Sequence, residues 1–388
     1  MSVKTITLGC RLNFAESETI ARSAPQNDEW VVINSCAVTS AAVRQSRQAV
    51  RRAHRENPNA KILVTGCAAE LEPEAFAALS GVSRVVGNAN KLNGFASNDG
   101  MAPVPAGFLG HVRSFVAVQM GCDHRCTFCS IWQARGASAS LPHAAVLEAV
   151  AREIDRGAQE IVLTGVDITD YEGGLGRLCQ RLLVAEPRLK RLRLSSLDSI
   201  EIDGALFELI AGEPRLMPHF HLSLQAGSEM ILKRMRRRHS RTAAVAIVDR
   251  IKTARADATI GADLIAGFPT ETEEMARNSL ELLDDCDIIA AHIFPFSPRP
   301  NTPAARMPQL PGEIVKTRAA QLRKAASIRR TRWLESLIGT RQRVLIENNG
   351  KGHTDNFAPV AIEGAVRGQT GTAEFRERDG DLLRAVFA

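Results

Sequence analysis

Aromatic residues are scarce in this sequence, which contains 14 Phe, three Trp and one Tyr. A protein that reads nucleic-acid bases mainly by stacking usually carries more of them, so this mode of recognition is disfavoured. No apolar run approaches the roughly 20 residues that a membrane-spanning helix needs. The opening residues, MSVKTITLGCRLN, also lack the basic segment and apolar stretch of a secretion signal. We therefore expect a cytoplasmic protein that makes no membrane contact.

Charge of one sign is limited as well, since 49 Lys and Arg stand against 43 Asp and Glu, for a net charge of +6. This mild excess is compatible with nucleic-acid binding without requiring it. The 388 residues are enough for two or three domains, and 45% hydrophobic and 24% charged residues are typical of a globular protein. Composition therefore bounds the class of protein and leaves its function open.

The eight cysteines are more informative. In a long chain without a secretion signal they are not expected to form a disulfide framework. Clustered cysteines in such a chain are better explained as metal ligands. Cys179 and Cys286 lie in apolar helix-like stretches, and we interpret both as buried and structural.

Three cysteines near the N-terminus follow a repeated pattern. Short β-branched segments predict strands at Val3–Leu8, Trp30–Asn34 and Lys61–Thr65, separated by helix-like stretches. Cys10, Cys36 and Cys67 each stand two residues beyond one of these strands. The alternation indicates an open parallel sheet, whose strands all end at the edge where such sheets place ligands. We expect a shared site there; three unrelated core cysteines are the alternative.

The alternation resumes after a Gly-, Pro- and Ser-rich stretch at 96–111, which predicts a linker. The expected strands are Phe115–Gln119, Glu160–Thr164, Arg191–Ser195, His219–Leu224, Thr259–Ile265 and Ile288–Phe294. Six such units indicate a partial TIM barrel of the (βα)6 type, with its chemistry at the C-terminal strand ends. Short strands between Thr340 and Ala388 predict a small C-terminal β-barrel. The expected fold class is α/β.

A dense cysteine motif follows the first strand of the predicted barrel. Cys122, Cys126 and Cys129 form a CxxxCxxC pattern. Three clustered thiolates suit an iron–sulfur cluster, which tolerates a missing fourth protein ligand more readily than structural zinc does. Zinc is the alternative, with His124 as the nearby fourth ligand, but its place inside the first cysteine spacing makes that geometry awkward.

This motif, with Phe128 before the last cysteine, resembles that of the radical S-adenosylmethionine (SAM) superfamily. The resemblance implies a 4Fe-4S cluster on Cys122, Cys126 and Cys129, whose open iron chelates the amino and carboxylate groups of SAM. It also implies reductive cleavage of SAM to a 5′-deoxyadenosyl radical. The protein then serves to position the cofactor and exclude water.

Further motifs narrow the resemblance to the radical SAM methylthiotransferase family. They are LGCRLN at 8–13, NSCAVT at 34–39, VTGCA at 64–68, LTGVD at 163–167, LSLQAGS at 222–228 and IAGFP at 265–269. Membership implies a second 4Fe-4S cluster on Cys10, Cys36 and Cys67, which carries the sulfur to be methylated and transferred. It also implies a methylthiotransferase domain at 1–95, the linker at 96–111, a radical SAM domain at 112–337 and a TRAM-like RNA-binding domain at 338–388.

Within the family, CAVT at 36–39 followed by RQSRQ at 44–48 most resembles the MtaB-type branch. That branch places a methylthio group on C2 of N6-threonylcarbamoyladenosine at position 37 of tRNA, beside the anticodon. Acid–base chemistry does not activate an aromatic C–H bond at neutral pH, so a radical route is sensible. The alternatives are an isopentenyl-type adenosine of tRNA, a ribosomal protein side chain, and a non-catalytic iron–sulfur RNA-binding protein.

The resemblance also implies roles for other residues. Expected SAM contacts are Phe128, Gly165, Asp167, Ser195, Gln225 and Gly267, with no catalytic residue beyond the cluster ligands. A capping role is the alternative for Asp167. Expected RNA contacts are Arg135, Arg234, Arg236 and Arg237, for which a solvated charged face is the alternative. Expected partners are the tRNA anticodon loop and an electron donor such as flavodoxin or ferredoxin, and the oligomeric state stays open.

The sequence departs from the family pattern in places. Alanines replace the later arginines after Arg135-Gly136, Thr270 stands where glycine is common, and His239 where tyrosine is common. These differences bear on the substrate more than on the class of reaction.

Overall fold

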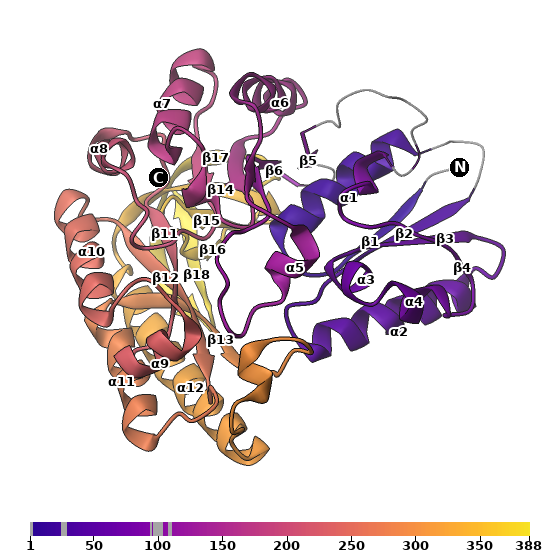
Figure 1. Cartoon of the computed structure of the whole chain (residues 1–388). Coiled ribbons are helices and arrows are strands. Elements are labelled where there is room, and N and C mark those ends of the chain that lie inside the picture. Colours follow the sequence, from indigo (N-terminus) through magenta and orange to yellow (C-terminus); the bar gives the residue numbers. More distant parts are fainter. Residues whose placement is uncertain (1–2, 25–28, 94, 96–103, 108–110) are drawn as a thin grey trace.

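The computed structural model describes residues 3–24, 29–93, 95, 104–107 and 111–388. They form a parallel four-stranded sheet, a partial barrel and a small closed β-barrel in chain order (Figure 1). This arrangement confirms the predicted α/β fold class. Of the residues described, no helix is long and apolar enough to span a membrane.

The N-terminal region alternates strands and helices. Its elements are β1 (Lys4–Thr7), α1 (Arg11–Ser23), β2 (Trp30–Ser35), α2 (Ser40–Glu56), β3 (Lys61–Gly66), α3 (Cys67–Leu71), α4 (Pro73–Ala77), β4 (Val82–Val85) and the 3-10 turn η1 (Lys91–Asn93). The four strands run parallel in the order β1-β2-β3-β4. The inner strands β2 and β3 are buried along nearly their whole length, as parallel strands covered by helices on both faces require.

The central region holds all six predicted barrel strands. Its elements are β5 (Ala106–Gly107), β6 (Arg113–Ala117), β7 (Gln119–Met120), α5 (Ile131–Arg135), β8 (Ala139–Ser140), α6 (His143–Asp155), β9 (Glu160–Thr164), η2 (Ile168–Asp170), α7 (Leu175–Ala185), β10 (Leu192–Leu194), α8 (Gly204–Gly212), β11 (His219–Gln225), α9 (Glu229–Met235), α10 (Arg241–Ala254), β12 (Thr259–Ala266), α11 (Glu273–Asp285), β13 (Ile288–Pro295), η3 (Pro303–Arg306) and α12 (Gly312–Ser336). The parallel strands β6, β9 and β10 form one sheet and β11 to β13 another, joined by isolated bridges.

The barrel stays open between β6 and β13, which do not pair with each other in the described part of the chain. Helix α1 packs against β5 and β6 at this opening, where Phe14 meets the edge of Phe115. The N-terminal region therefore covers the open side of the barrel. Most of the predicted linker, residues 96–103 and 108–110, lies outside the described residues, while β5 joins the barrel sheet antiparallel to β6.

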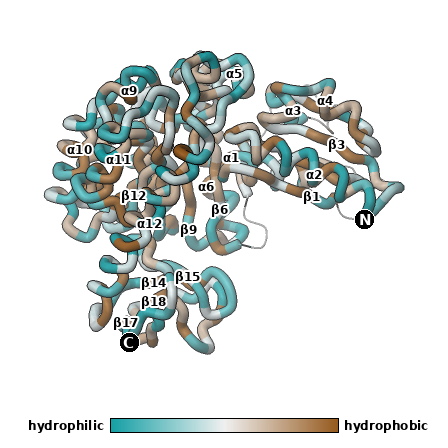
Figure 2. The backbone as a smooth tube through the Cα atoms, turned by 90° about the horizontal axis from the view of Figure 1, so that it is seen from below, coloured by the Kyte–Doolittle hydropathy of each residue, from teal (hydrophilic) through white to brown (hydrophobic). Residues whose placement is uncertain are grey.

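The C-terminal strands form the predicted small barrel. They are β14 (Arg341–Asn348), β15 (Lys351–Thr354), β16 (Pro359–Ala361), β17 (Thr370–Asp379) and β18 (Leu382–Phe387). Figure 2 shows them as a separate lobe against the central region. Phe357 stacks between His219 and His353 there, with ring centroids 5.1 and 4.4 Å away. Because His219 begins β11, this lobe lies at the N-terminal ends of the barrel strands, opposite the cysteine motif.

Candidate functional site

The N-terminal cysteines lie at one edge of the parallel sheet. Cys10 follows β1 and precedes α1, Cys36 follows β2, and Cys67 begins α3 directly after β3. Cys36 and Cys67 are buried, while Cys10 is exposed toward the cavity described below. Burial raises the pKa of Cys36 to about 11, and the nearby Cys67 and Cys10 add to the shift. The shared edge predicted from the strand pattern brings these thiols together.

Gly9 keeps space open inside this N-terminal trio. Its φ of +94° belongs to the left-handed region that glycine favours. A Cβ at this position would lie 2.7 Å from Sγ of Cys36. Only glycine therefore lets the chain pass so close to the sulfur.

The second trio, Cys122, Cys126 and Cys129, lies on one loop between β7 and α5. Burial raises the pKa of Cys122 to about 12 and that of Cys129 to about 11. The charge of Cys67, in the N-terminal trio, adds to the shift at Cys129.

All six cysteines line one cavity of about 1140 Å³ between the sheet edge and the partial barrel. The cavity continues past the cysteines to Phe357, at the N-terminal ends of the barrel strands. A chamber of this size takes a nucleoside-sized substrate together with a cofactor.

Arg135 supports the N-terminal trio from the loop side. Its Nε donates to Sγ of Cys67 at 3.3 Å, and its guanidinium binds Glu16 at 2.7 and 3.0 Å. Lys91 pairs with the same carboxylate from the other side. Burial opposes ionisation of Glu16, but the charges of Arg135 and Lys91 lower its pKa to about 2. The side chain of Arg135 is only 2% exposed, so it braces Cys67 instead of meeting an RNA phosphate as we predicted.

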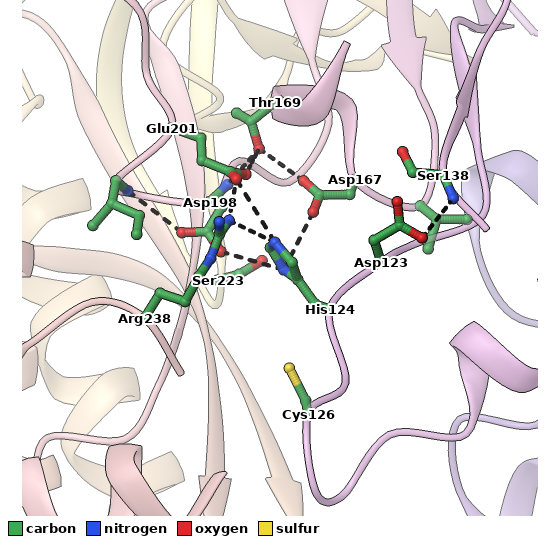
Figure 3. A network of polar contacts seen from close by, with 12 residues as sticks. Asp123, His124, Cys126, Ser138, Asp167, Thr169, Asp198, Glu201, Ser223 and Arg238 are labelled. Carbon is green, nitrogen blue, oxygen red and sulfur yellow. Dashed lines mark hydrogen bonds and ion pairs between the residues drawn. The ribbon is translucent and has the colours of Figure 1, made fainter. Parts of the chain in front are cut away.

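A network of acidic residues lies beside the second trio. Figure 3 shows His124 pointing toward Asp167, Asp198 and Glu201, with Cys126 farther along the same loop. The Nδ1 atom of His124 lies 3.4 Å from Asp167, and the carboxylate of Glu201 raises the pKa of this histidine.

His124 was the fourth ligand of the zinc alternative. Its ligand atom lies within 4.8 Å of those of Cys122 and Asp167, but both its ring nitrogens face carboxylates. Each trio offers three thiols around one cavity. In the N-terminal trio, Gly9 leaves free the space beside Cys36 that a side chain would fill. This soft donor set fits an iron–sulfur cluster with one open iron in each trio.

Five of the six predicted SAM contacts line the cavity: Phe128, Gly165, Asp167, Ser195 and Gln225. Gln225 has a φ of +67° at a register shift in β11, a strained conformation of the kind found at functional sites. Gly267 is not among the lining residues. Its missing Cβ would lie 2.9 Å from Cα of Val315, so this glycine permits close packing against α12.

The other predicted RNA contacts lie in the last turn of α9 and directly after it. Arg236 is exposed, Arg234 is half-buried and donates to the carbonyl of Thr270 at 3.2 Å. Arg237 points into the cavity, where it binds Asp198 at 2.7 Å and lies 3.8 Å from Sγ of Cys126. Of this group, Arg236 is therefore the one placed to meet a partner at the surface.

Sequence reasoning missed several polar residues that line the cavity. On β11, His219, His221 and Ser223 do so, at every second position in line with the predicted Gln225. That period of two is the mark of one face of a strand and was readable in the sequence. Arg11, Arg193, Asp263 and His292 line the cavity as well. Burial lowers the pKa of Arg11 to about 10, and the charges of Arg113 and Arg193 add to the effect.

Comparisons with known proteins agree with this geometry. Residues 116–283 match the family model of the radical SAM superfamily, and residues 2–87 match that of the uncharacterized protein family UPF0004. The radical SAM methyltransferase TsrM from Kitasatospora setae has a similar fold, with a TM-score of 0.54 at 15% identity, covering 74% of this chain and 66% of that chain.

Relatives over nearly the whole length are more specific. The threonylcarbamoyladenosine tRNA methylthiotransferase MtaB of Rickettsia prowazekii is 42% identical, covering 92% of this chain and 90% of the relative. MtaB of Thermotoga maritima is 34% identical, covering 89% and 86%. The tRNA-2-methylthio-N6-dimethylallyladenosine synthase of Erythrobacter litoralis is 30% identical, with the same coverage. With its two cysteine trios around one cavity, the chain belongs to the MtaB-type family of radical SAM tRNA methylthiotransferases.

Proposed function

We propose that this protein transfers a methylthio group to C2 of N6-threonylcarbamoyladenosine at position 37, in the anticodon loop of tRNA. The observation that carries the proposal is the single cavity lined by both cysteine trios. A substrate base in this cavity is within reach of the sulfur held by one trio and of the radical source held by the other. The MtaB relatives support the choice of this base.

We assign one cluster to each trio. Cys122, Cys126 and Cys129 hold the cluster that binds SAM, and Cys10, Cys36 and Cys67 hold the cluster that carries sulfur. When bound, these groups supply the electron, the radical and the sulfur that methylthiolation needs. Asp167, Ser195 and Gln225 line the cavity beside the second trio, where they orient SAM. Arg135 positions Cys67, and the surrounding protein excludes water.

The tRNA reaches the cavity from the cysteine side. Arg236, together with the exposed Lys233 beside it, provides positive charge for phosphates next to the second trio. The C-terminal barrel, the TRAM-like domain at 338–388, adds RNA contacts. Its cations contribute less attraction, because Arg341, Arg343 and Arg384 are paired with carboxylates of the same lobe. The electron donor is a small protein such as flavodoxin or ferredoxin, and the setting is the cytoplasm.

Two triple variants test this assignment after anaerobic reconstitution, when the wild-type chain should hold roughly eight irons. Replacing Cys122, Cys126 and Cys129 with Ala is expected to abolish SAM cleavage and product formation. Replacing Cys10, Cys36 and Cys67 with Ala is expected to spare cleavage to 5′-deoxyadenosine and stop methylthiolation. Each variant is the control for the other. Methylthio product from the second variant would overturn the sulfur-carrying role.

The substrate is tested by mass spectrometry of tRNA nucleosides with and without the gene. Loss of 2-methylthio-threonylcarbamoyladenosine alone is expected. Loss of a methylthiolated isopentenyl-type adenosine, or an unchanged tRNA profile, would contradict the proposed substrate.

A further inference from the structure

The cavity extends deeper than the cysteines and the predicted SAM contacts. Arg193 lies in β10, two residues before Ser195, and His221 stands four before Gln225 on β11. All four residues line the cavity. With a rise of about 3.3 Å per residue, Arg193 lies about 7 Å deeper than Ser195 along the barrel. The proposed function, as stated so far, gives this inner part no role.

Two half-buried arginines line the inner part of the cavity. Arg11, the first residue of α1, follows Cys10 and lines the cavity half-buried. Arg330 of α12 lines the same cavity, also half-buried. Neither guanidinium has a hydrogen bond or ion pair within the residues that the structure describes. A partly desolvated cation without a counter-ion favours an anion at its side.

Arg193 offers a third donor. Its side chain is 2% exposed, and its Nε and Nη2 atoms bind Glu160 at 2.8 and 3.2 Å. The Nη1 atom is buried and has no partner in the described part of the chain. A buried N–H group without an acceptor is costly, so this donor lacks a partner that a ligand can supply.

The nearby carboxylates do not fill this need, because they are engaged elsewhere. Asp263 accepts from His221 at 2.9 Å and from His292 at 3.1 Å. Glu160 is held by Arg193 and by Arg191, the latter at 3.0 Å. Arg11 and Arg330 therefore remain available to a ligand in the cavity, and their planar forks match the two oxygens of a carboxylate.

We propose that Arg11, Arg193 and Arg330 form a carboxylate-binding position that holds the threonyl carboxylate of the N6 substituent. This inference rests on the proposed function, and it names the residues that distinguish the acidic base from one with a neutral N6 group. The proposal places C2 of the base at the cysteines and its N6 substituent in the inner cavity. A dimethylallyl group there would leave the cations without a counter-ion, so the position also rejects such bases.

The test measures affinity in the reconstituted protein with anticodon stem-loop RNA. One RNA carries threonylcarbamoyladenosine, and a second carries the same base with its carboxylate converted to a carboxamide. The variants are Arg11→Gln and Arg330→Gln, with Arg11→Lys as the conservative variant. Lys324→Gln removes a charge from the exposed surface of the same helix as Arg330 and is the matched control. Arg193 is left intact, because its loss would remove one of the two arginines that hold the buried Glu160.

Arg11→Gln and Arg330→Gln are each expected to weaken binding of the acidic RNA by roughly 10- to 100-fold, as for a lost charged hydrogen bond. Binding of the carboxamide RNA should change by less than about twofold, and Arg11→Lys should restore part of the preference. Lys324→Gln should not alter the ratio of the two affinities.

Equal weakening of both RNAs would mean that these arginines bind backbone phosphate, and weakened SAM binding by equilibrium dialysis would mean that they hold the SAM carboxylate. Either result, or no weakening, would overturn the inference. The binding readout is independent of turnover. A wild-type protein that forms no methylthio product would therefore count against the proposed function and leave the carboxylate position to be decided by affinity.

Discussion

The two cysteine trios are built in opposite ways around the same cavity. The N-terminal trio collects one thiol from the end of each of three parallel strands, whereas the second trio comes from a single loop between β7 and α5. The positions of the thiols in the N-terminal trio depend on the register of the sheet and on buried charges, and Arg135 holds the sulfur of Cys67 in place. The positions of the thiols in the second trio depend on the backbone conformation of their own loop. Substitutions far from a cysteine should therefore disable the first trio more readily than the second.

Arg135→Gln is expected to have the largest effect. Arg135 lies in the chain next to the second trio, yet its contacts are with Cys67 and Glu16 of the N-terminal region. Breaking a buried ion pair should lower the free energy of unfolding by about 3 kcal/mol. Iron content should fall by about half, because the N-terminal cluster is lost and the other is kept.

Urea unfolding and iron analysis measure the two effects, with 5′-deoxyadenosine formation as the sign that the second trio still works. Arg135→Lys is the control, since it keeps a charge near Glu16 without the planar fork. If both clusters were lost in equal measure, the separation of the two trios would be wrong.

Gly9→Ala is expected to have the next largest effect. Gly9 has a φ of +94° and Gly136, after α5, has a φ of +77°, so alanine strains the backbone at both positions by about 1 kcal/mol. A Cβ at Gly9 would meet Sγ of Cys36, while a Cβ at Gly136 would meet nothing within 4 Å.

Gly136→Ala is therefore the matched control. Both variants should be destabilised in urea, but only Gly9→Ala should lose the absorbance and iron of the N-terminal cluster. A full complement of iron in Gly9→Ala would contradict this expectation, because the N-terminal trio would then accommodate the added methyl group and still hold its cluster.

Acid should weaken the N-terminal region through Glu16. The charges of Arg135 and Lys91 lower its pKa to about 2, from 4.5 for an ordinary glutamate. A lowered pKa means that the stabilisation is complete above about pH 4.5 and is lost as the pH falls toward 2. The free energy of unfolding should fall by at most about 3 kcal/mol over this range, because one pKa unit corresponds to 1.36 kcal/mol.

Urea unfolding of the metal-free protein across this pH range measures the loss. Glu16→Gln, although less stable at neutral pH, should show a flatter dependence on pH between 4.5 and 2. An unchanged slope would mean that Glu16 is not the group that titrates.

The same contrast explains what could be predicted from the sequence. The second trio is a local motif, and the first followed from strand ends at a sheet edge, so both needed only short-range patterns. The period of two on β11 was equally local, but we did not predict the cavity lining from it. The role of Arg135 was not predictable, because its partner Glu16 lies 119 residues earlier and meets it only through packing between regions. Arg11 was visible beside Cys10, but its lack of a partner is a property of the folded cavity.

Cys286→Ala is expected to have the smallest effect and tests whether the trios exhaust the metal-binding cysteines. Cys286 caps the C-terminus of α11 and is fully buried in the barrel core, and burial raises its pKa to about 12. Loss of one buried sulfur should lower the free energy of unfolding by about 1 kcal/mol through the small cavity it leaves. Iron content and methylthio product should match the wild type. A fall in iron at constant stability would mean that a cysteine outside the two trios takes part in holding a cluster.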